Sequence, residues 1–233
     1  MFKRALKAFR RHGFAKFCYL LAYNAGYYLR RIGRRGESDP SGRSLDEALG
    51  VETTEIREIG SLDIDSRHAA HAGRYQPSGV DLVRQILRDC GIRYSDFVFI
   101  DFGCGKGRVM LLAAEFPFRR ILGVEFSREL HEILQKNIAA LLGRTNGCRN
   151  IQAVLGDAAD LELPDDPLVC YFYNPFGEIV MREVVGNIER SLRKSPRDVF
   201  VIYVEPLHPH VFDEAHWIVV KRDSRHIIYQ SRS

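Results

Sequence analysis

The sequence lacks three patterns that would assign it at once: a C-x-x-C cysteine pair, a G-x-S-x-G or P-loop motif, and an uninterrupted apolar run of the ~20 residues that a membrane span needs. The apolar stretch over residues 17–29 is interrupted by Asn24 and Gly26, and no small-residue cleavage site follows it, so we expect no signal peptide. The cysteines are odd in number and scattered, which excludes a disulfide framework and zinc-finger spacing and indicates a reducing, cytoplasmic compartment. They are Cys18, Cys90, Cys104, Cys148 and Cys170.

Acidic residues are absent from residues 1–36, which we call the basic arm. The arm holds ten Lys and Arg side chains, whereas the rest of the chain holds 24 basic against 30 acidic ones. Its apolar residues recur at helical spacing, which predicts a basic amphipathic helix. Such a helix can lie on an anionic membrane surface, contact nucleic-acid phosphates, or pack in a solvated position on its own domain. Residues 36–44 are rich in turn-forming residues and read as a linker, so residues 1–44 are expected to be arm and linker.

Residues 45–233 are expected to form one α/β domain. The hydrophobic fraction of 45% excludes a disordered protein, and a chain of 233 residues buries about 70% of its unfolded surface. Helices are expected after the capping residues Ser78 and Ser127 and over residues 106–116 and 179–192. Short apolar runs predict strands over residues 97–101, 121–125, 151–155, 168–173, 199–204, 217–221 and 226–229.

The last two of these strands are separated by only four residues, which is too few for a helical crossover, so they must form an antiparallel hairpin. The preceding helix–strand alternation favours parallel strands with helices on both faces. The sequence therefore predicts a Rossmann-like, doubly wound, mostly parallel seven-stranded sheet with a C-terminal hairpin.

A glycine-rich turn follows the first predicted strand. Gly103, Gly105 and Gly107 stand where the chain turns from strand to helix, and each lets the backbone bend sharply or lets a ligand approach. Dinucleotide enzymes use G-x-G-x-x-G because a pyrophosphate rests on the helix end. Here the spacing is G-x-G-x-G directly after Asp101, and a carboxylate suits a ligand with ammonium and sulfonium groups better than a pyrophosphate.

Two further acids follow the next two strands. Glu125 ends the second strand, where a carboxylate can accept hydrogen bonds from both ribose hydroxyls of a nucleoside. Asp157 follows the third strand and can accept a hydrogen bond from an adenine amino group. Singly, each acid is an ordinary loop carboxylate. Together with Asp101 they predict a nucleoside site at one edge of the sheet.

With these motifs, residues 78–229 resemble the class I, seven-strand S-adenosylmethionine-dependent methyltransferases. The resemblance implies that S-adenosylmethionine is the cofactor, that Glu125 binds the ribose, that Asp157 lies beside the adenine, and that Phe126 covers the adenine face. It places the residues around the cofactor at Tyr75, Gln76, Asp101, Gly103, Cys104, Gly105, Gly107, Glu125, Phe126, Gly156, Asp157, Ala158 and Asn174.

The fourth strand leads into Asn174-Pro-Phe-Gly177, which resembles the Asn/Asp-Pro-Pro-Tyr/Phe loop of amino methyltransferases. In that loop an amide oxygen and a backbone carbonyl accept hydrogen bonds from the target nitrogen, and an aromatic ring stacks on the substrate. This chain has one proline where the nucleobase-specific form has two. The alternative is a simple turn that ends a buried strand.

A closer likeness is to the non-SET histone-lysine methyltransferases, which pair a tyrosine-containing segment before the first helix with an Asn-Phe loop. This resemblance implies that Tyr75, Asn174 and Phe176 are catalytic and form a channel for a lysine stem. Gln76 stands where that group often has Glu. Tyr75 and Glu205 are the candidates for a general base.

The expected function is therefore N-methylation of a protein amine, with a protein substrate as the partner. The alternatives are N-methylation of nucleic acid and a non-catalytic module that keeps the fold and associates with a membrane through the basic arm. No metal site is expected: His68 and His71 lack a third ligand, and His208 and His210 flank Pro209 in a loop, where they are either solvated or border the substrate mouth.

Overall fold

The structure is a computed structural model that describes residues 39–55 and 76–232. The basic arm with its expected helix, and the candidates Tyr75, His68 and His71, lie outside the described residues. The chain divides into two compact units, residues 1–39 and 40–233, and the second contains the elements described. None of the described helices combines the length and the apolar composition needed to cross a bilayer.

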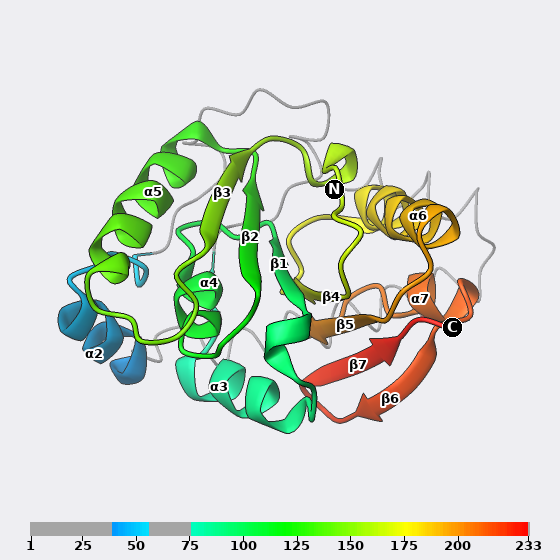
Figure 1. The fold of residues 1–233 in the computed structure, drawn as a ribbon, viewed down its shortest axis with the longest axis horizontal. Coiled ribbons are helices and arrows are strands. Elements are labelled where there is room, and N and C mark those ends of the chain that lie inside the picture. The colour runs from blue at the N-terminus through cyan, green and yellow to red at the C-terminus, as the bar shows by residue number, and fades with distance from the viewer. Residues whose placement is uncertain (1–38, 56–75, 233) are drawn as a thin grey trace, which may run out of the picture. The chain divides into compact units, whose positions relative to one another are not determined.

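The second unit contains a seven-stranded sheet in the order β3-β2-β1-β4-β5-β7-β6 (Figure 1). Neighbouring strands from β3 to β5 run parallel, whereas β7 pairs antiparallel with both β5 and β6. This order confirms the predicted Rossmann-like sheet and its terminal hairpin. The strands are β1 (Val98–Phe102), β2 (Arg120–Glu125), β3 (Ile151–Leu155), β4 (Leu168–Phe172), β5 (Val199–Val204), β6 (Ile218–Arg222) and β7 (His226–Gln230).

Position in the sheet explains the sequence of each strand. Every residue of β1 and β4 is buried, because these strands lie at the centre of the sheet with helices on both faces. Strand β3 lies at one edge and is only partly buried, and β6 at the other edge exposes most of its residues. Continuous apolar runs therefore mark the centre of the sheet.

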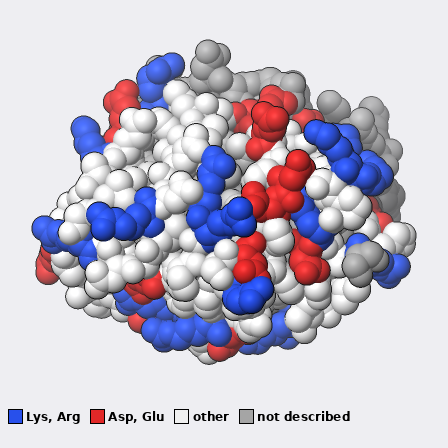
Figure 2. All heavy atoms as spheres, in the orientation of Figure 1, with Lys and Arg blue, Asp and Glu red and all other residues white. Residues whose placement is uncertain are grey.

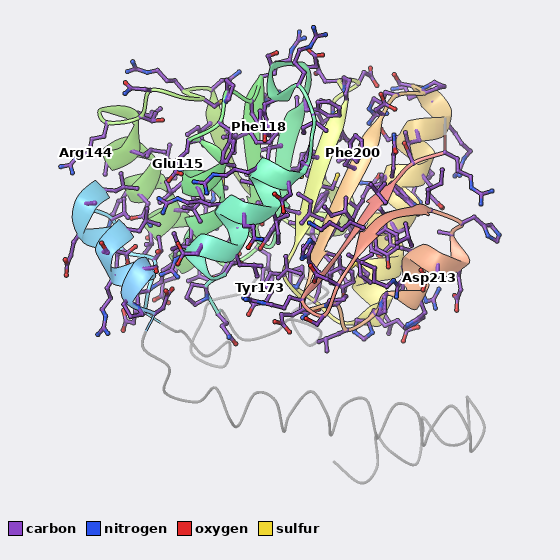
Figure 3. The ribbon with its side chains drawn as sticks, turned by 90° about the horizontal axis from the view of Figure 1, so that it is seen from below. Glu115, Phe118, Arg144, Tyr173, Phe200 and Asp213 are labelled. Carbon is purple, nitrogen blue, oxygen red and sulfur yellow. The ribbon has the colours of Figure 1, made fainter. Side chains whose placement is uncertain are left out.

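Helices cover both faces of the sheet (Figure 3). The α3, α4 and α5 helices contribute to the hydrophobic core on one face, and α6 and α7 contribute to the core on the other. Helix α2 packs beside α3. The helices are α2 (Pro40–Leu49), α3 (Val80–Asp89), α4 (Arg108–Ala113), α5 (Arg128–Leu142), α6 (Glu178–Lys194) and α7 (His210–Glu214), with short 3-10 turns η3 (Tyr94–Asp96) and η4 (Ala158–Asp160).

The parallel strands all end at one edge of the sheet. In Figure 3 Tyr173, which follows β4, lies at this edge, and Phe118, which precedes β2, lies at the opposite edge. Loops that follow β1, β2, β3, β4 and β5 therefore meet at a single edge, which is where open α/β sheets bind their ligands.

Local signals at three helix starts have different outcomes. Ser127 caps α5 by accepting a hydrogen bond from the N–H of Leu130, as predicted. Ser78 does not cap α3, whose N-cap is Gly79; its hydroxyl instead accepts a hydrogen bond from Tyr171 at 3.0 Å. Helix α4 begins at Arg108 rather than at residue 106, because Gly107 has a φ of 86° that a right-handed helix cannot contain.

The linker predicted over residues 36–44 is wrong for residues 40–44, which form the first half of α2. Proline is favoured in the first turn of a helix because its missing N–H would have no partner there. Pro40 therefore starts this helix, although its turn-forming character predicts a linker.

Candidate functional site

The glycine turn between β1 and α4 requires glycine at all three predicted positions. Gly103, Gly105 and Gly107 have φ angles of 73°, 55° and 86°, in the left-handed region that other residues rarely adopt. A Cβ atom on Gly103 would lie only 2.4 Å from the Cβ of Pro175. The turn thus packs directly against the segment that follows β4.

Glu125, at the end of β2, is hydrogen-bonded to this turn. Its Oε2 accepts a hydrogen bond from the N–H of Gly105 and its Oε1 accepts one from the N–H of Ser127, both at 2.8 Å. Burial raises the pKa of Glu125 to about 7, although these backbone N–H groups stabilise the charged form. The N–H of Phe126 is a third backbone partner of this carboxylate, which has about four lone-pair sites, so one site can still accept a hydrogen bond from a ligand's hydroxyl group.

Asp101, in β1, is also buried, with 3% of its surface exposed. Burial, together with the nearby charge of Glu125, raises the pKa of Asp101 to about 8. A cation bound beside such a pair favours the ionised carboxylates, since opposite charge offsets the cost of their desolvation. The two acids therefore suit a positively charged ligand.

The loop after β3 reaches the same place. The N–H of Gly156 donates a hydrogen bond to the backbone carbonyl of Glu125 at 2.9 Å. Asp157 caps η4 by accepting a hydrogen bond from the N–H of Ala159, and Ala158 is buried in that turn. Phe126 is partly buried beside Glu125. The sheet thus brings Asp101, Glu125 and Asp157 to one edge, at or next to the ends of adjacent strands.

Asn174 joins the loops after β4 and β5. It adopts a φ of 43°, its Nδ2 donates a hydrogen bond to the carbonyl of Glu205, and its Oδ1 accepts one from the N–H of Leu207 at 3.1 Å. Its role in positioning the second loop has no signal in the sequence, because the partners lie more than 30 residues away. The Oδ1 atom keeps one acceptor position, so the amide remains available to a substrate.

The other predicted acceptor-site residues lie near this loop. Phe176 packs against Phe172 with a ring-centroid distance of 6.4 Å in an edge-on arrangement. Gln76 is exposed, and its Nε2 donates a long hydrogen bond of 3.4 Å to the hydroxyl of Tyr173. This contact places the segment before α3 beside the end of β4. Tyr75, the residue next to Gln76, lies outside the described residues.

Cys104 lies in the glycine turn and is buried. Burial raises the pKa of its thiol well above the usual value, with the charges of Asp101 and Glu125 adding to the rise. The thiol is therefore protonated and poorly nucleophilic. The four cysteines that the structure describes are all free.

Sequence reasoning missed a strap, residues 51–55, that crosses the start of α4. Arg108 is buried and donates hydrogen bonds to the hydroxyls of Thr53 and Thr54, each at 2.8 Å. Lys106 is fully buried and forms an ion pair with Glu52. Two cations from the glycine turn are thus held by a segment about 50 residues earlier in the chain, and no local motif indicates that pairing.

Comparison with known proteins agrees with this geometry. Residues 99–195 match a family model described as a methyltransferase domain. A search of curated proteins gives no match.

Among solved structures, this chain is similar to yhhF from Escherichia coli, which is assigned as a methyltransferase. The two sequences are 17% identical, the match covers 76% of this chain and 98% of yhhF, and the TM-score is 0.50. A predicted N6-adenine-specific DNA methylase from Listeria monocytogenes is also 17% identical with a TM-score of 0.50, over 67% of this chain and 52% of its own. At this identity the likeness shows a shared fold.

Proposed function

Because this chain is a class I S-adenosylmethionine-dependent methyltransferase, we propose that it methylates a nitrogen atom of a protein amine. The observation that carries the proposal is the contact between the glycine turn and the Asn174 loop. Gly103 has no room for a side chain because Pro175 packs against it. A cofactor on the turn and an acceptor at Asn174 would therefore be neighbours.

The residues at the turn fit the cofactor. When bound, S-adenosylmethionine supplies a methyl group activated by a positively charged sulfonium. Asp101 and Glu125 are the buried carboxylates that would hold its charged and ribose parts, and Asp157 would accept a hydrogen bond from its adenine. Asp101 has a pKa of about 8, and a cation bound beside it would lower that pKa and so favour the ionised carboxylate.

The remaining task of the protein is to hold the acceptor lone pair in line with the methyl group and to exclude water. The amide of Asn174 supports this role, since its two hydrogen bonds to the loop after β5 fix its orientation. Tyr173 and Phe176, which are only partly buried, provide aromatic surface beside it for an aliphatic lysine stem. Glu205 and Tyr75 remain the candidates for removing a proton from the amine.

Nucleic acid is the other acceptor class that the Asn-Pro-Phe loop supports. Protein is favoured because the Asn174-Pro-Phe-Gly177 loop has one proline where the nucleobase-specific form of the loop has two. Figure 2 shows one face of the molecule, on which Lys and Arg side chains are interspersed with Asp and Glu.

Incubation of a cell extract with the purified enzyme and methyl-labelled S-adenosylmethionine tests the acceptor class. We expect label in the protein fraction, on amine side chains. Label that enters only nucleic acid or small molecules would overturn the proposal while leaving the methyltransferase activity intact.

Two variants separate the cofactor site from the acceptor site. Glu125→Ala should weaken binding of S-adenosylhomocysteine by about 1–3 kcal/mol, because it leaves backbone donors unpaired. Asn174→Ala should weaken that binding less than Glu125→Ala does and should lower turnover by about 100-fold, because the acceptor loses its alignment. Equal turnover in Asn174→Ala and the unmodified enzyme would remove Asn174 from the acceptor site.

A further inference from the structure

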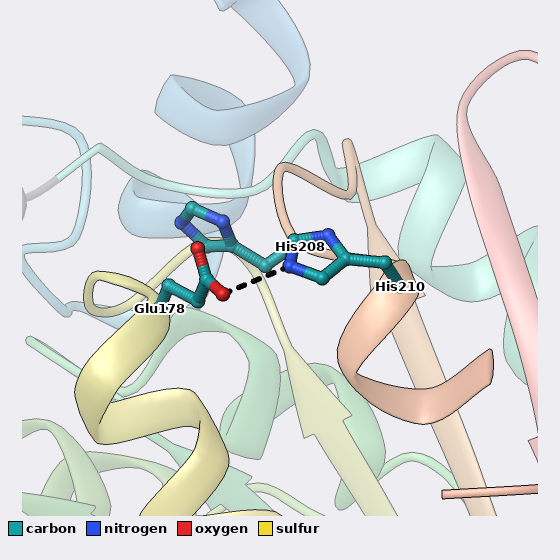
Figure 4. Close-up of side chains that lie close together, drawn as sticks. All are labelled: Glu178, His208 and His210. Atoms are coloured by element: carbon teal, nitrogen blue, oxygen red, sulfur yellow. Dashed lines mark ion pairs between the residues drawn. The ribbon is translucent and has the colours of Figure 1, made fainter. Parts of the chain in front are cut away.

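Three potential metal ligands converge next to the acceptor loop. Glu178 begins α6, His208 lies in the loop after β5, and His210 begins α7 (Figure 4). One ligand atom from each of these side chains lies within 4.8 Å of the others. The Oε1 of Glu178 is 3.0 Å from the Nε2 of His210.

Two imidazole nitrogens in this cluster are buried and have no hydrogen bond from the part of the chain that the structure describes. They are the Nδ1 of His208 and the Nε2 of His210. The second lies 3.0 Å from the Oε1 of Glu178, with which it forms an ion pair when the imidazole is protonated. A buried polar nitrogen without a hydrogen bond is costly, and coordination of a cation would satisfy the Nδ1 of His208 and take the place of the proton between His210 and Glu178.

We propose that Glu178, His208 and His210 bind a divalent cation of the zinc type. Two neutral imidazoles and one carboxylate form the ligand set of zinc sites that keep a coordination position open. A zinc ion lies about 2 Å from each ligand atom, so the ligands of a tetrahedral site lie roughly 3.3–3.6 Å apart. The three ligand atoms lie within 4.8 Å of one another, so binding of the ion would draw them closer together.

One neighbouring cation competes for the carboxylate. Arg182 donates a hydrogen bond from Nη2 to the Oε1 of Glu178 at 2.9 Å and another from Nη1 to Glu214 at 2.8 Å. Because Glu214 remains as a partner, Arg182 stays paired when Glu178 turns an oxygen toward the ion. The charge balance of the cluster therefore tolerates a bound cation.

The position of the site suggests its role. Glu178 stands four residues after Asn174, and His208 directly follows Leu207, whose N–H donates to Asn174. An ion held by Glu178 and His208 would clamp the two segments that fix Asn174. The coordination position left open could accept a lone pair from a substrate. The proposal for the cation does not depend on which acceptor is methylated.

The test uses the untagged, full-length enzyme, treated with a chelator and then dialysed. We expect calorimetry with Zn²⁺ to show one equivalent bound per chain, and Co²⁺ to give the visible absorption of a nitrogen- and oxygen-ligated ion. His208→Ala and His210→Ala should each weaken binding by more than the roughly 10- to 100-fold cost of losing an outer hydrogen-bond partner.

His216→Asn is the matched control. His216 is an exposed histidine six residues from His210, and its φ of 60° is one that asparagine accepts. This variant should bind Zn²⁺ as the unmodified enzyme does. Absence of stoichiometric binding, or equal binding in all three histidine variants, would overturn the proposal. Circular dichroism and the melting temperature without metal distinguish lost coordination from lost folding.

Discussion

Asp101 and Glu125 place two ionisable groups with raised pKa values in the proposed cofactor site. Their folded pKa values of about 8 and about 7 exceed the ordinary values of 3.8 and 4.5. The folded state therefore binds more protons than the unfolded state between about pH 4 and pH 8. By linkage, the free energy of unfolding falls as pH rises through that range. The two carboxyls thus lower the stability of the fold as the pH rises toward 8.

The same pKa values predict a pH-dependent affinity for the cofactor. Between pH 6 and pH 7.5 the affinity for S-adenosylmethionine should rise about tenfold, because binding of the cation releases protons from these carboxyls. S-adenosylhomocysteine lacks the sulfonium charge and should show a smaller rise. Calorimetry in buffers with different heats of ionisation measures both the affinity and the protons released.

Asp101→Asn is the control for that dependence. It should flatten the rise for S-adenosylmethionine, and it should raise the melting temperature of the free enzyme at pH 8, where the unmodified carboxyl is forced to ionise. A steep pH dependence that persists in Asp101→Asn would assign the titration to another group.

At the scale of elements, the strap over α4 stabilises the glycine turn through its contacts with Lys106 and Arg108. The side chain of Arg108 satisfies the hydroxyls of Thr53 and Thr54, and Asp46 accepts hydrogen bonds from the N–H and hydroxyl groups of both threonines. Asn137 of α5 binds the carbonyls of Glu52 and Lys106 at 3.0 and 2.9 Å. Helices α2, α4 and α5 are joined through this one short segment.

Arg108→Ala should therefore destabilise the domain by about 2–4 kcal/mol, because it leaves buried hydroxyl and carbonyl groups without donors and opens a cavity. Denaturant unfolding followed by fluorescence measures the loss. Arg193→Ala, an exposed position on α6, should change stability by no more than about 0.5 kcal/mol. Similar effects of the two substitutions would argue against a supporting role for the strap.

Elements whose signals are local were predictable from the sequence. Ser127 caps α5 through a residue three positions away, and the hairpin of β6 and β7 follows from a short connection. Elements that depend on distant partners were not. Ser78 is of a residue type that often caps helices, but its hydroxyl instead accepts a hydrogen bond from Tyr171, 93 residues later. Pro40 has turn character, but the fold uses it to begin a helix.

The same difference between local signals and distant partners applies to the residues of the site. Asp101, Glu125 and Asp157 were placed correctly at one sheet edge, because strand order fixes where the strand ends lie. The sequence does not predict that Lys106 and Arg108 pair with the strap, because that pairing depends on how the chain before α3 crosses the domain. The second ligand segment of the proposed cation site, at His208 and His210, lies about 30 residues from Glu178 and shows no motif spacing.

At the scale of the whole molecule, the basic arm is a separate unit from the domain that carries the site. We propose that this arm associates with anionic membrane surfaces, because its ten basic side chains accompany apolar residues at helical spacing. Vesicles of anionic phospholipid should float the full chain, and vesicles of neutral phospholipid should not.

Deletion of residues 1–36 should abolish this flotation and preserve cofactor binding and turnover. If the shortened chain still floats, the domain and not the arm contacts the membrane. If the shortened chain no longer binds the cofactor, the arm is needed for the enzyme's own function. High salt should weaken flotation in proportion to the screened charge.

The contact between Gly103 and Pro175 has a thermodynamic consequence. It joins the turn proposed to hold the methyl donor to the loop proposed to hold its recipient, so a shift of either segment is transmitted to the other. Whatever factor the donor adds to the affinity for the recipient, the recipient must return to the donor, because the cycle of binding steps closes. A single missing side chain thus couples the binding of the two substrates.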